Sequence, residues 1–127
     1  MPSKIRLERI ADRIRQDLSE MIVQRVSDPR LANVNITDVK VDRELAFADV
    51  YVSSFEGVDA APEILAGLNH ASGFLRSQLA AQIELRTFPR LRFHWDPTPE
   101  HADKMERLFE QIKQETTDTE ETSRHGS

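Results

Sequence analysis

A glycine lies inside the longest helical pattern of the chain, at position 73. Apolar residues recur at helical spacing on both sides of it, at Leu65, Leu68, Ala71, Leu75, Leu79 and Ile83, which predicts helix throughout. Because glycine costs a helix interior roughly 1 kcal/mol relative to alanine, we expect a bend, a helix end or a close backbone approach at Gly73. If a second helix begins there, its free N–H groups and positive dipole end, with Arg76 one turn in, would attract an anion such as phosphate.

Length and composition indicate one small globular domain. The 127 residues suffice for one hydrophobic core, and we expect a domain over 1–115 followed by a disordered acidic tail over 116–127. The longest apolar run has four residues, 45–48, so we expect neither a membrane span nor a signal peptide. The chain has no cysteine, which removes disulfides and thiolate chemistry and suits a cytoplasmic protein.

The distribution of charge limits the kind of nucleic-acid binding to expect. The net charge is −5, from 17 basic and 22 acidic residues, and residues 115–127 hold four of the acids against Arg124 alone. A permanent ribosomal protein would normally be strongly basic. Any contact with nucleic acid should therefore be local and reversible.

Hydrophobic periodicity predicts the order of the elements. We expect a helix over 4–25 ended by Asp28-Pro29, a hairpin of strands 34–42 and 46–55 with a bulge near 37–38, a helix from a cap at Asp59 to about residue 85, a strand over 91–95, and a last helix from Thr98 to 112. The order α-β-β-α-kink-α-β-α predicts an α+β fold in which helices cover a three-stranded sheet. The crossover helix allows the second and third strands to run parallel.

This order of elements resembles that of a type II KH domain. The amino-acid sequences of several segments resemble the ribosome-binding factor A family. The segments that carry the resemblance are residues 9–14, Asp28-Pro29-Arg30-Leu31, 48–53, 75–86 and 89–96. Ala71-Ser72-Gly73 is similar to the small-x-Gly kink by which that family replaces the GxxG loop of ordinary KH domains. The resemblance covers about residues 4–113.

The resemblance implies a cytoplasmic, non-enzymatic factor that binds the free small ribosomal subunit and its rRNA. It would act in late maturation, including formation of the rRNA 5′ end, and matter most in the cold. The alternatives to this function are a general KH-type RNA-binding module and a permanent ribosomal protein. We expect no cofactor, metal, small-molecule substrate or membrane partner, and a monomer.

The predicted RNA site centres on Ala71, Ser72 and Gly73, where the kink would receive an rRNA segment as a GxxG loop does. Arg76 would supply charge there. The alternatives are that Gly73 is a packing or C-cap glycine and that Arg76 is an exposed arginine paired with an acid.

Two further groups of basic residues are candidates for RNA contact. Arg6, Arg9 and Arg13 cluster within about 60° on one border of the first helix's apolar stripe, although such a cluster can also be a solvated face. The second group is Lys40 and Arg43 near the hairpin and Arg90 and Arg92 on the last strand. A phosphate-dominated contact would weaken with salt.

Neither base stacking nor catalysis is favoured by the remaining residues. Phe93 and Trp95 lie on the same face of the predicted strand as Leu91. This indicates that their side chains belong to the hydrophobic core and do not stack on bases. His70, His94 and His101 with Asp96 could be imagined as a metal or hydrolytic site, but their spacing matches no known ligand or triad pattern.

Overall fold

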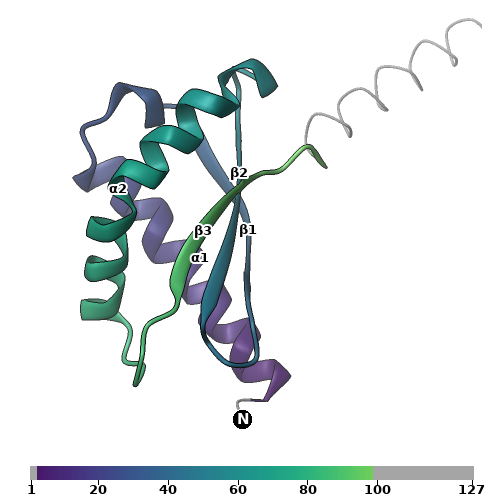
Figure 1. Ribbon diagram of the computed structural model, residues 1–127, viewed down its shortest axis with the longest axis vertical. Coiled ribbons are helices and arrows are strands. Elements are labelled where there is room, and N and C mark those ends of the chain that lie inside the picture. Colours follow the sequence, from purple (N-terminus) through teal and green to yellow (C-terminus); the bar gives the residue numbers. More distant parts are fainter. Residues whose placement is uncertain (1–2, 99–127) are drawn as a thin grey trace, which may run out of the picture. The chain divides into compact units, whose positions relative to one another are not determined.

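The structure, a computed structural model, describes residues 3–98, and the fold below is that of the compact unit that ends at Asp96. Its elements in chain order are α1 (Lys4–Arg25), the 3₁₀ turn η1 (Pro29–Leu31), β1 (Val34–Val41), β2 (Phe47–Ser54), the 3₁₀ turn η2 (Val58–Ala60), α2 (Ala61–Gln82) and β3 (Arg90–Trp95). Figure 1 shows how α1 and α2 lie beside the sheet.

Helix α1 spans the predicted residues, 4–25, and begins at a side-chain cap. The Ser3 side chain accepts a hydrogen bond from the Arg6 backbone N–H, an N-cap that satisfies one of the free donors of the first turn. After the helix, Asp28 caps η1 by accepting from the Arg30 N–H. The apolar stripe of α1 is buried, at Ile10, Ala11, Ile14, Leu18, Met21 and Ile22.

Strands β1 and β2 form the expected antiparallel hairpin, and the expected bulge is present. The register shifts between Ile36 and Asp38, so that the two halves of β1 present their apolar residues to the same face. In the turn, the Asp42 carboxylate accepts from the backbone N–H groups of Ala46 and Phe47. Asp42 thereby closes the connection that the sequence places at 42–45.

Helix α2 connects β2 to β3, and these two strands run parallel. Two details of the prediction are wrong. Asp59 is not the helix cap, because it lies within η2 and α2 starts after Ala60 without a side-chain cap. The helix ends at Gln82 instead of about residue 85, because Ile83 is already extended.

The sheet has the order β1-β2-β3, and both helices pack on one of its faces. Side chains of α1, α2 and the sheet meet in a single core that includes Leu18, Leu68, Val50 and Phe93. The α+β class and the helix-covered, three-stranded sheet of a KH-like fold are therefore as predicted. None of the described helices covers the opposite face, called here the outer face of the sheet. The predicted last helix (98–112) and acidic tail (116–127), and with them the boundary at 115, fall outside the described residues, apart from the first residue of that helix.

Candidate nucleic-acid interface

Helix α1 carries its arginines along one border of the buried stripe, as predicted. Arg6 and Arg9 are exposed, and their side chains have no hydrogen bond or ion pair within residues 3–98. Arg13 pairs with Asp17 at 2.9 Å and also reaches the backbone carbonyl of Gln82, 3.5 Å away at the end of α2. This row of three, called here the arginine edge, therefore lies on the side of α1 that faces the end of α2.

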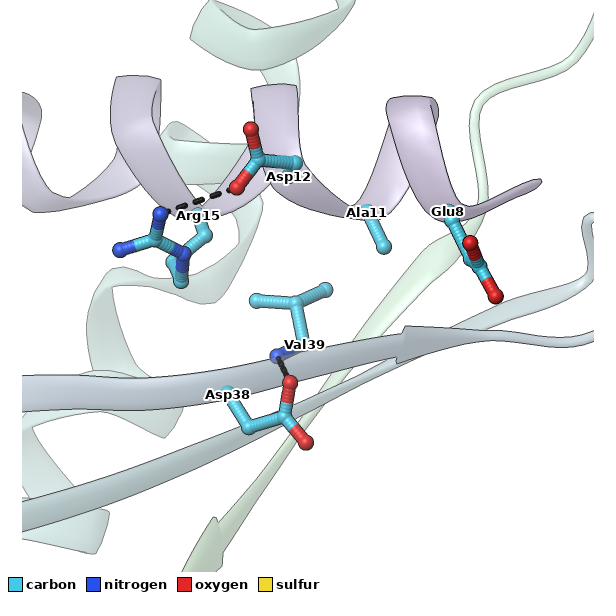
Figure 2. Close-up of a pocket in the computed structure, with 6 residues that line it drawn as sticks. All are labelled: Glu8, Ala11, Asp12, Arg15, Asp38 and Val39. Atoms are coloured by element: carbon cyan, nitrogen blue, oxygen red, sulfur yellow. Dashed lines mark hydrogen bonds and ion pairs between the residues drawn. The ribbon is translucent and has the colours of Figure 1, made fainter. Parts of the chain in front are cut away.

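The opposite border of α1 is acidic and faces β1. Figure 2 shows Glu8 and Asp12 along this border, with Val39 pointing up from β1 toward the helix and Asp38 pointing to the other side of the strand. Arg15 is paired with Asp12 at 2.9 Å, so its charge is already matched. Because Glu8 has no ion pair within residues 3–98 and would repel phosphate, the side of α1 that suits RNA is the arginine edge.

Helix α2 bends without breaking. It is assigned as one helix of 22 residues, and Figure 1 shows it changing direction near its middle, the part of the helix that holds Ala71-Ser72-Gly73. Gly73 does not adopt a positive φ. The expected bend is present, whereas the second helix N-terminus with its free N–H groups is not, so a helix-dipole anion site at this position is ruled out.

The two glycines of α2 have opposite surroundings. A Cβ atom built on Gly73 would meet no atom within 4 Å, and the residue is exposed. A Cβ on buried Gly67 would lie 3.1 Å from Leu31 Cδ2 and 3.2 Å from Asp28 Oδ2. Gly67 is therefore the packing glycine, which sequence reasoning missed, and Gly73 presents open backbone to the surroundings.

The turn that packs on Gly67 is held by an ion pair. The Arg30 guanidinium donates to both carboxylate oxygens of Asp28, the shortest contact being 2.7 Å. These hydrogen bonds lower the pKa of Asp28 from its ordinary value. The Asp28-Pro29-Arg30-Leu31 segment thus packs as a capped, ion-paired turn against the first half of α2.

On the side of α2 next to α1, the candidate interface includes residues that the sequence analysis did not single out. Phe74 and Gln78 are one turn apart, and the Phe74 side chain is 47% exposed. Arg25, from the end of α1, donates to the Gln78 side chain. No acidic residue occurs between Glu63 and Glu84, so this stretch of α2 carries no carboxylate that would oppose a phosphate.

Arg76 has a partner that neither sequence-based alternative anticipated. It is half-buried, and its guanidinium donates to the carbonyl of Phe88 at 2.7 Å and to that of Pro89 at 3.3 Å. The side chain is directed to the loop before β3, whose Phe88 and Pro89 carbonyls accept its N–H groups. Arg76 thus ties α2 to β3 and is not free to serve the kink.

The other predicted cations lie on or beside the outer face of the sheet, away from α2. Lys40, Arg43 and Arg90 are exposed, and Arg92 makes a two-pronged ion pair with Asp49 at 2.8 and 3.0 Å. The Arg92 guanidinium, with a smaller effect of His94, lowers the pKa of Asp49. The predicted RNA residues therefore form two separate surfaces, one on the helices and one on the sheet.

The histidines and the aromatic core residues have separate environments. His94 bonds Asp49 at 2.7 Å, whereas Asp96 accepts from the Thr37 hydroxyl. Within residues 3–98 no group of three His, Cys, Asp or Glu side chains could hold a metal ion, and His101 lies outside this range. Phe93 is part of the core, as predicted, and Trp95 packs against it.

The chain matches one family along most of its length. The family model described as ribosome-binding factor A matches residues 6–109. Ribosome-binding factor A of Aromatoleum aromaticum is 38% identical over 113 residues, which are 88% of this chain and 89% of that protein. The protein of the same name from Thiobacillus denitrificans is 44% identical over 105 residues, 83% and 85% of the two chains.

Solved structures give the same result. The crystal structure of ribosome-binding factor A from Thermus thermophilus is similar with a TM-score of 0.63 and 27% identity, over 70% of this chain and 93% of that one. A homology model of the Thermus thermophilus factor, fitted into a cryo-EM map of its complex with the 30S subunit, has a TM-score of 0.59 and 27% identity, over 72% and 96%. No helix within residues 3–98 has the length and apolarity to cross a membrane.

Proposed function

We propose a function for this chain from one premise: the chain belongs to the ribosome-binding factor A family. It binds the free small ribosomal subunit through the subunit's rRNA and acts in the late maturation of that subunit in the cytoplasm. Formation of the rRNA 5′ end and a requirement in the cold are part of this proposal and follow from the family resemblance. The 30S complex of the Thermus thermophilus factor supports the choice of partner.

The open backbone at Gly73 is the observation that carries the proposed binding site. A sugar–phosphate chain can approach a helix closely only where side chains are short, and Ala71, Ser72 and Gly73 are short. Because nothing fills the space beside Gly73, the small residue is not needed for packing there. No residue from Ile64 to Ile83 is acidic, so this stretch of α2 does not itself repel a phosphate.

The charge for this contact comes from α1. The arginine edge, with Arg6 and Arg9 unpaired within the described chain, faces the end of α2, and Arg25 lies between it and the bend. These guanidinium groups suit phosphate oxygens. Recognition then rests on the backbone and shape of folded rRNA, without a catalytic group, so the protein acts by binding and is not an enzyme.

Substitution of Gly73 by aspartate tests the site. The carboxylate enters open space, so the fold is preserved while a phosphate is repelled, and we expect affinity for purified small subunits to fall at least tenfold. The control is Ser27→Asp, which adds the same charge at an exposed position of the loop between α1 and η1, outside both the bend and the sheet. Unchanged binding by a folded Gly73→Asp protein would refute the proposed site.

The cellular role is tested separately by sucrose-gradient fractionation of a lysate. A maturation factor should sediment with free small subunits and be missing from translating ribosomes. Equal presence in both fractions would favour a permanent ribosomal protein, although the acidic balance of the chain argues against that alternative.

A further inference from the structure

The outer face of the sheet carries aromatic rings as well as cations. Tyr51 and Phe47 alternate with Asp49 on β2, and all three side chains are half-buried on the face that no described helix covers. The Tyr51 ring lies 5.2 Å from the His94 ring, at 31° to it. Strand pairing places His94 opposite Tyr51, so the rings form a short row across the two strands.

Cations lie directly over these rings. The Arg92 guanidinium carbon is 4.0 Å from the centre of the Phe47 ring, and the Lys40 ammonium is 5.5 Å from the centre of the Tyr51 ring. Arg90 is the strand partner of Phe47 and is exposed. Planar groups and positive charge thus occupy the same surface, a combination that suits both the bases and the backbone of a nucleic acid.

Three carboxylates on this side of the sheet accept hydrogen bonds from the protein itself. Asp49 is bound by Arg92 and His94, the Asp42 carboxylate closes the hairpin turn, and Asp38 accepts from the Val39 N–H. In contrast, Arg43 and Arg90 have no ion pair within the described chain. Only Asp49 of these three carboxylates is matched by a cation, and the guanidinium groups of Arg43 and Arg90 are therefore available to phosphate oxygens.

We propose that the outer face of the sheet is a second RNA-binding surface, on which unpaired bases stack against the Tyr51 ring and against the Arg92 guanidinium plane that covers Phe47, while Lys40 and Arg90 contact the backbone. The occupant is a single-stranded segment, because a duplex hides the faces of its bases from such rings. An acidic peptide would use the cations but would gain nothing from the aromatic row.

This inference goes beyond the proposed function, because it concerns a different surface and a different form of RNA. The bend in α2 and the arginine edge belong to the helical layer, whereas Tyr51 and Phe47 face away from that layer. Each surface can therefore be disabled without touching the other.

The test uses the full chain and an oligoadenylate of about ten nucleotides, within the range that single-strand-binding surfaces cover, with affinity followed by fluorescence anisotropy. Tyr51→Val keeps a good strand former but removes the ring, and we expect it to weaken binding about tenfold. Tyr51→Phe keeps the ring and should bind like the parent protein. Arg86→Gln removes an exposed charge outside the strands and serves as the control for Arg92→Gln, which should weaken binding.

Several outcomes would overturn the proposal. Binding by Tyr51→Val equal to that of the parent protein would exclude stacking on this ring, and Phe47→Val provides a second, independent removal of a ring. Equal affinity for a duplex of the same length would mean that charge alone is recognised. Loss of oligoadenylate binding in Gly73→Asp but not in Tyr51→Val would place the single strand on the helices.

Discussion

Gly67 and Gly73 lie six residues apart in α2, yet a methyl group would be in tight contact with the neighbouring turn at the first and meet nothing at the second. The two glycines therefore have different structural roles. Gly67 lets η1 approach the helix closely, so that Leu31 can be buried. Gly73 leaves part of the helix surface bare, which is the condition for a close approach by another molecule.

This difference predicts opposite effects on stability. Gly73→Ala should raise the free energy of unfolding by up to about 1 kcal/mol, because alanine favours helix and has room. Gly67→Val should lower it by roughly 1–3 kcal/mol through overpacking against Leu31 and Asp28. Urea unfolding of both variants measures the contrast, and destabilisation by Gly73→Ala would show that the bend depends on glycine.

The arginine edge predicts how binding responds to salt. Affinity for small subunits should fall linearly on a log–log plot against salt concentration. Replacing Arg6 or Arg9 by glutamine should reduce the slope by roughly 1 for each phosphate that the variant no longer neutralises. The control is Glu8→Gln, on the opposite border of the same helix, which should not reduce the slope. If the arginine substitutions leave the slope unchanged, the arginine edge does not contact the rRNA.

The position of Arg76 predicts a structural phenotype. Arg76→Met removes the donors to the Phe88 and Pro89 carbonyls and should lower the free energy of unfolding by about 1–3 kcal/mol. The exposed Arg86 is the matched control, since Arg86→Met should change stability by no more than about 0.5 kcal/mol. Thermal and urea unfolding measure both. Equal effects of the two changes would contradict the anchoring role of Arg76.

The lowered pKa of Asp49 predicts a dependence of stability on acid. Because its pKa in the folded protein is below the ordinary value of 3.8, the contribution of this carboxylate is present above that pH and lost as the pH falls through the lower, folded value. Asp49→Asn should be less stable than the parent protein at pH 6 but lose less stability on acidification to about pH 3. The measurement is urea unfolding across this pH range. If the free energies of unfolding of the two proteins change in parallel with pH, Asp49 does not contribute to the acid dependence.

Much of the fold could be predicted because it depends on local patterns. The stripe from Ile10 to Ile22 defines the buried side of α1, and the phase change within β1 requires the bulge between Ile36 and Asp38. Alternation in β3 assigns Phe93 to the core and Arg92 to the outer face. In each case the relevant neighbours are a few residues apart, so periodicity is enough to identify them.

The candidate site depended on partners that only the folded chain brings together. Arg76 bonds carbonyls 12 and 13 residues away, Arg13 reaches the carbonyl of Gln82 69 residues away, and Arg92 holds Asp49 across 43 residues. Sequence alone determined which side chains are helical, which are extended and which are buried, because these properties follow from spacing along the chain. The tertiary structure decided which of the exposed charges are already paired and which glycine is bare, because both depend on what packs against each residue.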